Sequence, residues 1–367
     1  MPDYSRNVFC LLGLPFDAVD IAQAAGKIRA SIDGNKRCFL STPNLNFLIA
    51  CRKDPVFRAS VVNSDLVVAD GMPIVWLTRL LGIPIQQRVA GSDLFEVLRR
   101  PSCGRKINVF FLGGQDGIAE MAASTINSEN LGMYCVGHLS PGFGTIESMS
   151  TTETLQAINS SNSDFLVVSL GARKGQEWIT NNLKALSAPV ISHLGAVVNF
   201  VAGNVQRAPR AFQTIGLEWL WRIKEEPQLW KRYFDDGLGL LSLMVRNVIP
   251  LLVSQLVDKL AKNTSVPAAI QIHLNADHIQ IVLEGHWDVN SLQPLREALT
   301  HIASAECKDL CIDMHAATGI DSSFAGLLLL AHGYHTKTGH SLKIENASRK
   351  VVRKLRWMGA AALCNGD

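Results

Sequence analysis

The chain has 367 residues, of which 47% are hydrophobic and 18% are charged, a composition typical of folded proteins with large cores. This length exceeds that of one typical domain and indicates two, one large and one small. The formal net charge of +3 excludes a strongly basic protein, so we expect no nucleic acid partner and only local basic surfaces.

The eight cysteines indicate a reducing compartment. They are scattered, none forms a C-x-x-C pair, and most lie in hydrophobic runs, where a free thiol behaves as a small hydrophobic group. The N-terminal residues place an acidic side chain before a very short hydrophobic run and contain no A-x-A cleavage site. They are typical of a first strand and not of a signal peptide. We therefore expect a cytoplasmic protein.

Residues 1–205 alternate short β-rich runs with segments of helical period. The expected strands are residues 8–12, 37–40, 66–68, 107–112, 133–136, 165–169 and 190–192. The expected helices include residues 45–51, 117–125 and 177–186. This order predicts an α/β domain with a Rossmann-like, mostly parallel sheet and helices on both faces. In such folds ligands bind beyond the carboxyl ends of the strands.

Residues 206–261 differ in composition and are expected to form a helical appendage. Residues 207–232 contain six cationic residues, three glutamates and three of the seven tryptophans. Residues 238–257 are long and hydrophobic enough to cross a membrane, but they include Arg246 and Asn247, which are costly in hydrocarbon. A basic, tryptophan-rich segment before a hydrophobic one is typical of a helix on an anionic membrane surface. A helical hairpin packed on the main domain fits the same composition.

After residues 262–266 the pattern changes again, which indicates a linker. The expected strands beyond it are residues 269–274, 278–284, 309–313 and 341–345. The expected helices are residues 291–303, 323–336 and 348–358. About 100 residues of mixed α and β structure suffice for an independent domain, so residues 267–367 are predicted to form a small α/β domain.

Two polar motifs follow strands of the N-terminal domain. Thr42 and Asn44 lie in STPNLNFL, and Asp70 and Gly71 lie in VVADGMPIV. A carboxylate at the carboxyl end of a strand suits a general base, particularly beside a glycine that lets a ligand approach the backbone. An Asp-Gly pair after a strand is also a common turn.

Two further motifs combine glycine with a strand end. In FFLGGQDG, Gly113 and Gly114 are expected to open a helix whose backbone N–H groups would face a diphosphate. The motif matches neither G-x-G-x-x-G nor the Walker pattern, which weighs against dinucleotide and ATP. In SLGARKGQEWI, Gln176 and Glu177 follow another strand, a pattern that an ordinary helix N-terminus also explains.

In this order the motifs resemble the WecG/TagA/CpsF family of glycosyltransferases. The resemblance continues through RVAGSDLFEVL, PGFG, RAP and GLEWLWRIKEEPQLWKRY and covers about residues 8–245. It implies that Asp70 is the catalytic base and that Thr42 and Asn44 line the same pocket. The positions that it implies around the UDP-sugar are Arg88, Asp93, Gly113, Gly114 and Gln176. The appendage arginines that it implies for the acceptor diphosphate are Arg207, Arg222 and Arg232.

The resemblance also implies substrates. Family members typically transfer N-acetylmannosamine from a UDP donor to undecaprenyl-diphosphate-linked N-acetylglucosamine, and some relatives in exopolysaccharide synthesis use UDP-glucose. We therefore expect a UDP-sugar donor, a lipid-diphosphate-linked acceptor and a peripheral position on the inner face of the bacterial cytoplasmic membrane. Because arginines bind diphosphate oxygens bidentately and no D-x-D motif occurs, we expect catalysis without a metal cofactor.

Two positions depart from the family pattern. Arg173, Lys174 and Gly175 stand where relatives often have proline before the Gln-Glu pair, and Asn199 stands where they often have aspartate. Both changes bear on donor choice, so a UDP-glucose-using transferase stays an alternative. A signalling scaffold that binds UDP-sugar without turnover is an alternative from a different functional class.

Residues 267–362 resemble a STAS domain through LEGHWDVNSLQPLREAL, LCIDMHAATGIDSSFAGLLLL and VVRKLRWMGA. Such domains are regulated by phosphorylation of a serine at a helix N-terminus, and Ser322 matches that position. The resemblance implies a kinase or an anti-sigma-like partner. Phe324 replaces the small glycine that usually follows, which would block kinase access, and Asp321 with Ser322 also suits a plain helix cap.

Overall fold

The computed structural model describes residues 2–101, 104–142, 144–205, 208, 209, 212, 216–260, 266–275, 277–305 and 307–364. The chain forms two compact units. The larger unit contains Val19–Trp76 and Ile85–Asp236, and the smaller unit contains Met1–Ala18, Leu77–Pro84 and Gly237–Asp367. The smaller unit thus brings together the two ends of the chain. The three-part division into residues 1–205, 206–261 and 267–367 stays a prediction.

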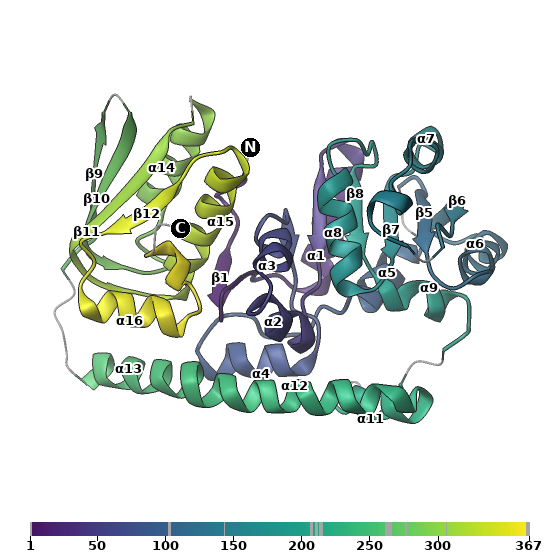
Figure 1. The fold of residues 1–367 in the computed structure, drawn as a ribbon, viewed down its shortest axis with the longest axis horizontal. Coiled ribbons are helices and arrows are strands. Elements are labelled where there is room, and N and C mark those ends of the chain that lie inside the picture. The colour runs from purple at the N-terminus through teal and green to yellow at the C-terminus, as the bar shows by residue number, and fades with distance from the viewer. Residues whose placement is uncertain are drawn as a thin grey trace. The chain divides into compact units, whose positions relative to one another are not determined.

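The larger unit is built on a sheet of six parallel strands in the order β4-β3-β8-β7-β5-β6 (Figure 1). The strands are β3 (Cys38–Ser41), β4 (Leu66–Val67), β5 (Ile107–Gly113), β6 (Met133–Leu139), β7 (Phe165–Ser169) and β8 (Val190–His193). The helices that lie wholly in this unit are α1 (Ile21–Asp33), α2 (Leu45–Cys51), α3 (Pro55–Val62), α5 (Gly91–Arg99), α6 (Ile118–Glu129), η1 (Glu147–Met149), α7 (Thr152–Ser160), α8 (Ala172–Asn182), α9 (Gly195–Val201), α11 (Glu218–Glu225) and η2 (Pro227–Leu229). Two helices begin here and end in the smaller unit, α4 (Met72–Leu80) and α12 (Trp230–Leu243).

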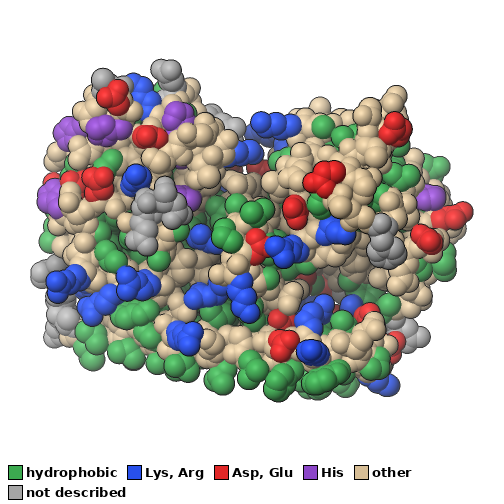
Figure 2. Space-filling view, in the orientation of Figure 1, with side chains coloured by type: hydrophobic (Ala, Val, Ile, Leu, Met, Phe, Trp, Pro, Cys, Tyr) green, Lys and Arg blue, Asp and Glu red, His purple; other side chains and the backbone are tan. Residues whose placement is uncertain are grey.

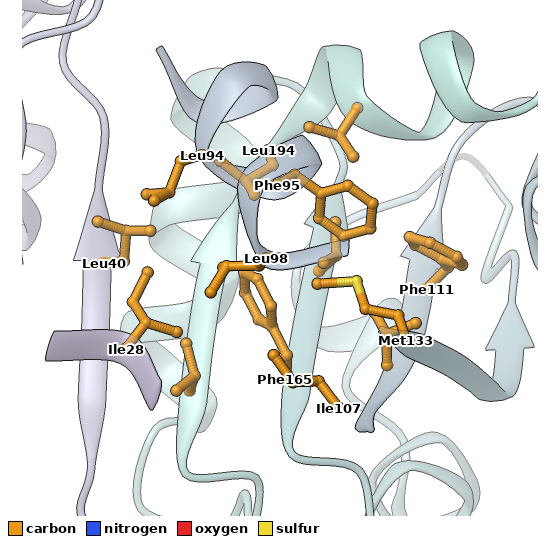
Figure 3. Close-up of a cluster of buried hydrophobic side chains, with 14 of the residues drawn as sticks. Ile28, Leu40, Leu94, Phe95, Leu98, Ile107, Phe111, Met133, Phe165 and Leu194 are labelled. Carbon is orange, nitrogen blue, oxygen red and sulfur yellow. The ribbon is translucent and has the colours of Figure 1, made fainter. Parts of the chain in front are cut away.

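Both faces of this sheet are buried, as expected for parallel strands that are hydrophobic at nearly every position. One core contains Leu40, Phe111 and Phe165 with residues of α1, α5, α6 and α9 (Figure 3). The other core contains Phe110 and Trp178 with residues of α7 and α8. Phe110 and Phe111 point to opposite cores because side chains alternate along a strand. The predicted parallel sheet with helices on both faces is confirmed.

The expected first strand does not join this sheet. It forms β1 (Val8–Leu11), which pairs antiparallel with β2 (Leu14–Asp17) in the smaller unit. Only Leu12 and Gly13 connect the two strands, and both have positive φ, 52° and 98°. Two-residue hairpin turns of this kind match the twist of the paired strands. A hairpin therefore replaces the expected crossover into the parallel sheet.

The smaller unit contains a four-stranded sheet in the order β12-β11-β10-β9. Its strands are β9 (Ala269–Leu274), β10 (His278–Trp287), β11 (Asp309–Ile320) and β12 (Leu342–Glu345). β9 is antiparallel to β10, whereas β10, β11 and β12 are parallel. Its helices are α13 (Ile249–Leu260), α14 (Gln293–Ser304), α15 (Ser322–Lys337), α16 (Arg349–Trp357) and η4 (Ala361–Leu363). The predicted small α/β domain is confirmed, with elements close to the expected ranges.

Helix α15 is buried on nearly every side, since β1 and β2 pack against it in addition to the four-stranded sheet. Gly326 makes this possible, because a Cβ atom there would lie 2.9 Å from the Val8 carbonyl oxygen and 3.0 Å from the Cys10 nitrogen. The Cys10 thiol donates to the Met358 carbonyl oxygen at 3.3 Å. Arg6 and Asp17 form a buried ion pair at 2.6 Å. The N-terminal hairpin is thus an integral part of the C-terminal fold.

A long helix links the two sequence regions. The segment Pro227–Leu260 is helical throughout, with mean hydropathy of 1.7 in its most hydrophobic window, and is long and hydrophobic enough to cross a membrane. It comprises η2, α12, the π-helical η3 (Met244–Val248) and α13. The π-helical turn lies directly before Pro250, which cannot donate a helical hydrogen bond. Its exposed hydrophobic side chains recur every three or four residues: Trp230, Phe234, Leu238, Leu241, Val245, Ile249, Val253, Leu256 and Leu260.

Replacing Gly326 by alanine is expected to destabilise the smaller unit by about 1–3 kcal/mol, because the added methyl group forces backbone atoms apart. Thermal unfolding and amide exchange of the purified chain measure this loss. The matched control is Gly26→Ala in α1, where a Cβ atom meets nothing within 4 Å and alanine favours the helix. Equal stability of Gly326→Ala and the unaltered chain would contradict the packing described.

Candidate active site

The polar residues expected at the strand ends lie at one edge of the parallel sheet. Thr42 follows β3, Asp70 follows β4, and Gly113 ends β5. Gln176 lies in α8, the helix after β7. Because all six strands are parallel, these ends meet at the edge where ligands bind in such folds. We therefore place the candidate site there.

Asp70 and Thr42 meet at the start of α5. The Gly91 N–H points to the Asp70 carboxylate, with 3.5 Å between nitrogen and oxygen. A Cβ atom on Gly91 would lie 3.5 Å from the Thr42 hydroxyl oxygen and 2.5 Å from Leu194 Cδ2, so a larger residue here would displace the Leu194 side chain. Asn44 lies nearby: its Cβ atom is 3.8 Å from the position that a Cβ atom on Gly71 would occupy. The structure therefore brings the three expected catalytic residues together.

The Asn44 side chain has a local role in addition. Its oxygen accepts a hydrogen bond from the Phe47 N–H at 3.1 Å and caps α2. Such a cap satisfies one of the free N–H groups of a helix start. The cap fixes the direction of the Asn44 side chain, whose place in a sugar pocket stays a prediction.

Arg88 binds two carboxylates from different helices. It pairs with Asp93 of α5 at 2.8 Å and with Glu218 of α11. Only 12% of the Arg88 side chain is exposed, so the two ion pairs compensate for its removal from water. The expected residues Arg88 and Asp93 are thus neighbours of the Asp70 region. Glu218 was missed by the sequence analysis as a site residue, although it lies within the quoted motif GLEWLW.

Asp70 has an unusual proton affinity. The pKa of its carboxyl group is raised to about 7, chiefly because the group is removed from water. The negative charges on Glu218 and Asp93 raise this pKa further. The positive charge on Arg88 and the hydrogen bond from the Gly91 N–H lower it. An ordinary aspartate has a pKa of about 4. A carboxyl group that titrates near neutral pH is suited to accept and release a proton during catalysis.

Gln176 lies beneath this cluster and is fully buried. Its amide nitrogen donates to the Ser41 hydroxyl at 2.9 Å, and Ser41 and Ser64 share a hydrogen bond at 2.7 Å. Within the described part of the chain, the Gln176 carbonyl oxygen has no hydrogen-bond partner. Gln176 therefore supports the residue before Thr42, while its expected contact with the UDP-sugar stays a prediction. Ser41 was not among the expected site residues.

Gly113 and Gly114 do not open a helix, contrary to the expectation, since α6 begins four residues after Gly114. Both have positive φ, 94° and 96°. A Cβ atom on Gly113 would lie 2.6 Å from the Ser169 carbonyl oxygen. The Gly114 N–H donates to the same oxygen at 2.9 Å. These glycines therefore join the ends of β5 and β7, and the Gly114 N–H is already used in that contact.

The appendage arginines differ in what surrounds them. Arg207 lies outside the described residues. Arg222 pairs with Glu226 at 3.0 Å and lies over the Phe200 ring. Arg232 is exposed and lies over the Tyr233 ring. Nothing in these contacts brings Arg222 or Arg232 to Asp70, so their role toward a diphosphate stays a prediction.

One departure from the family pattern has a structural reason. The buried ring of His193, at the end of β8, lies against Gly175, where a Cβ atom would come within 2.2 Å of the ring. Burial lowers the pKa of His193 to about 4, so the ring is neutral at physiological pH. His193 thus requires glycine at position 175. No spacing or motif in the sequence pairs these two residues.

The expected regulatory site lies in the smaller unit at the start of α15. Ser322 is partly exposed. Asp321 caps the helix by accepting hydrogen bonds from the Ser323 and Phe324 N–H groups, each at 2.9 Å. Phe324 is buried against Trp287. The interpretation of Asp321 as a helix cap is confirmed, and phosphorylation of Ser322 stays a prediction.

Comparison with known proteins agrees with the architecture. Residues 9–252 match the Glycosyl transferase WecG/TagA/CpsF family, and residues 270–364 match the family described as Mlab, STAS domain.

Similar proteins include three named N-acetylglucosaminyldiphosphoundecaprenol N-acetyl-beta-D-mannosaminyltransferase. Those of Bacillus spizizenii and Bacillus subtilis are each 28% identical over 201 residues, covering 55% of this chain and 76% and 77% of the relatives. One from Staphylococcus aureus is 22% identical over 224 residues, covering 60% of this chain and 85% of the relative. Because the first family match spans more than half of the sequence, this chain belongs to the WecG/TagA/CpsF family of glycosyltransferases, with a STAS domain in its C-terminal part.

Proposed function

We propose that the chain is an inverting glycosyltransferase that moves N-acetylmannosamine from a UDP donor to an undecaprenyl-diphosphate-linked N-acetylglucosamine acceptor. The reaction would serve cell-surface polysaccharide synthesis. The observation that carries this proposal is Asp70, with its pKa of about 7, at the ligand-binding edge of the sheet. The names of the relatives support the sugar and the lipid acceptor.

In this proposal Asp70 is the general base. Its carboxylate accepts the proton of the acceptor hydroxyl while that oxygen bonds to the anomeric carbon of the donor sugar. The bond from this carbon to the UDP oxygen breaks, and UDP leaves with the bonding electron pair. One displacement from the opposite side inverts the anomeric configuration. Thr42 and Asn44, which lie beside Gly91 and Gly71 at the same sheet edge, are proposed to orient the sugar hydroxyls.

We further propose that transfer needs no divalent metal. The carboxylates of Asp93 and Glu218 already bind Arg88, which leaves them less available as metal ligands. The negative charge that develops on departing UDP would be met by arginine side chains, which bind diphosphate oxygens in pairs of hydrogen bonds. Arg207, Arg222 and Arg232 are the proposed group for the acceptor diphosphate.

The protein is proposed to act at the inner face of the cytoplasmic membrane as a peripheral protein. The hydrophobic row over α12 and α13 (Figure 2) supports contact with lipid. The opposite side of this helix packs on protein in the smaller unit, where Val248 and Leu251 are buried and the Gln255 amide donates to the Leu81 carbonyl oxygen at 3.2 Å. A helix with one side on protein and one hydrophobic side exposed suits the membrane surface better than a span.

A UDP-glucose-using transferase is the second candidate, favoured by the two departures from the family pattern. Gly175 in the first turns of α8 lies against the His193 ring, and Asn199 lies in α9, the helix that follows β8. Competition between UDP-N-acetylmannosamine and UDP-glucose for one lipid-diphosphate acceptor distinguishes the two donors. A kinase or anti-sigma-like partner of the STAS domain stays a prediction, as does a scaffold without turnover.

Sugar transfer is the direct test. The full chain is incubated with a panel of UDP-hexoses and a short-chain lipid-diphosphate-N-acetylglucosamine, and the glycosylated lipid is measured by mass spectrometry. Asp70→Asn is expected to lower kcat by at least about 100-fold, because the base is lost. Asp33→Asn, at the exposed last residue of α1, is the matched control and should keep full activity. Absence of transfer from every UDP-hexose, or full activity of Asp70→Asn, refutes the proposal.

The pH dependence of transfer tests the role of Asp70 as the base. Deprotonated Asp70 is the active form, so kcat/KM should rise with pH through about 7 and then level off. Glu218→Gln removes a negative charge that raises this pKa and frees Arg88 to act on Asp70, so the rise should move to lower pH. Glu225→Gln, on the same helix but exposed, should leave the profile unchanged. An unchanged profile in Glu218→Gln contradicts the assignment.

A further inference from the structure

Helix α16 of the STAS domain carries a row of arginines beside the hydrophobic row of α13. We propose that α16 and α13 together form a binding surface for anionic phospholipid, so that the STAS domain itself attaches the enzyme to the membrane. This inference rests on the proposed action at a membrane, and it adds a lipid preference carried by the arginines of α16, which lie outside the transferase family region. The supporting observations all lie within the smaller unit.

The two helices are held together by polar contacts. Asp258 of α13 pairs with Lys350 at 2.7 Å and with Lys354 at 2.6 Å, both of α16. The Asn247 amide, in η3 directly before α13, donates to the Trp357 carbonyl oxygen at 2.9 Å. Only 7% of the Lys354 side chain is exposed, so its charge requires a partner. The side of α13 that faces α16 is therefore fixed.

The opposite side of α13 is hydrophobic and exposed. Its side chains are between 47% and 82% exposed and recur at helical spacing: Ile249, Val253, Leu256, Val257 and Leu260. Asp258 lies on the other side of the same helix, as its contacts with α16 show. Burial of such a row is the driving force for a helix to bind at a bilayer surface.

The exposed side of α16 is basic. Arg349, Arg353 and Arg356 are exposed at spacings of four and three residues, which places them on one face of the helix. Among the residues that the structure describes, none forms an ion pair with these three arginines. α16 contains no acidic residue. Its outer face thus carries three positive charges that no carboxylate in the described part of the chain pairs with.

The arrangement of the two rows favours lipid over an acidic protein. Figure 2 shows Lys and Arg side chains gathered next to the hydrophobic row over α13. At a bilayer surface the hydrophobic row would enter the boundary between headgroups and acyl chains. The arginines beside it would then lie at the level of the headgroups. Arginine stems are long enough to reach headgroup phosphates from such a position, and guanidinium groups bind phosphate bidentately. Basic residues near a bilayer add affinity for anionic lipid specifically.

Vesicle binding tests this inference. The full chain is sedimented with vesicles of phosphatidylcholine alone and with vesicles of phosphatidylcholine and phosphatidylglycerol in equal parts. We expect tighter binding to the anionic vesicles, weakened by added salt. The triple variant Arg349→Gln, Arg353→Gln, Arg356→Gln should lose at least about tenfold in affinity for anionic vesicles. The matched control removes three exposed lysines of the larger unit, Lys27→Gln, Lys36→Gln, Lys184→Gln, and should bind as the unaltered chain does.

Equal binding to both vesicle types, unchanged binding of the arginine variant, or an equal loss in the lysine control would each overturn the inference. A variant with lysine at the three positions keeps the charge and should restore binding even if the glutamine variant folds poorly. Capture of polyglutamate in place of anionic vesicles would assign the surface to an acidic protein and also overturn it. Vesicle binding needs neither donor nor acceptor, so sugar transfer to a detergent-dispersed acceptor by the unaltered chain tests the proposed function separately.

Discussion

The candidate site depends on one guanidinium group that is nearly removed from water. Arg88 binds Asp93 at the start of α5 and Glu218 in α11, and its charge also acts on Asp70. Three carboxylates gathered in a poorly solvated region would repel one another strongly without this cation. Arg88 therefore permits an acidic cluster at the edge of the sheet and holds α11 against the transferase core. Burial and these charges together place the pKa of the Asp70 carboxyl group at about 7.

Much of the fold could be predicted because the parallel strands have a strong local signal. Ile107–Gly113 and Phe165–Ser169 are hydrophobic at nearly every position, as strands buried on both faces must be. The run that forms β1 has the same appearance, yet it belongs to a hairpin packed against α15. Both environments bury both sides of a strand, so composition cannot tell them apart. The deciding feature is the backbone at Leu12, whose positive φ is unusual for leucine and invisible in the sequence.

The site was predictable to the extent that its residues follow strands. Thr42 and Asp70 lie at the ends of adjacent parallel strands, and the rule for ligand binding in such sheets brings them together. Glu218 is 130 residues from Arg88 and sits in a helix whose pattern shows only periodicity. The contact between His193 and Gly175 could not be predicted either, because a steric fit between two residues distant in the sequence produces no periodic sequence pattern. The Gly113-Gly114 pair was misread because glycines that join two strands resemble glycines that open a helix.

The hairpin at the start of the chain has a consequence for biosynthesis. Val8, Phe9 and Cys10 are synthesised long before the helix that covers them, which begins at residue 322. The Cys10 thiol bonds a carbonyl group 348 residues away. Domains generally fold as they emerge, from the N-terminal end onward, but this segment must wait until α15 has been synthesised. Until then its hydrophobic strands are available to chaperones or to neighbouring nascent chains. A polypeptide that ends before α15 would lack the helix against which this hairpin packs.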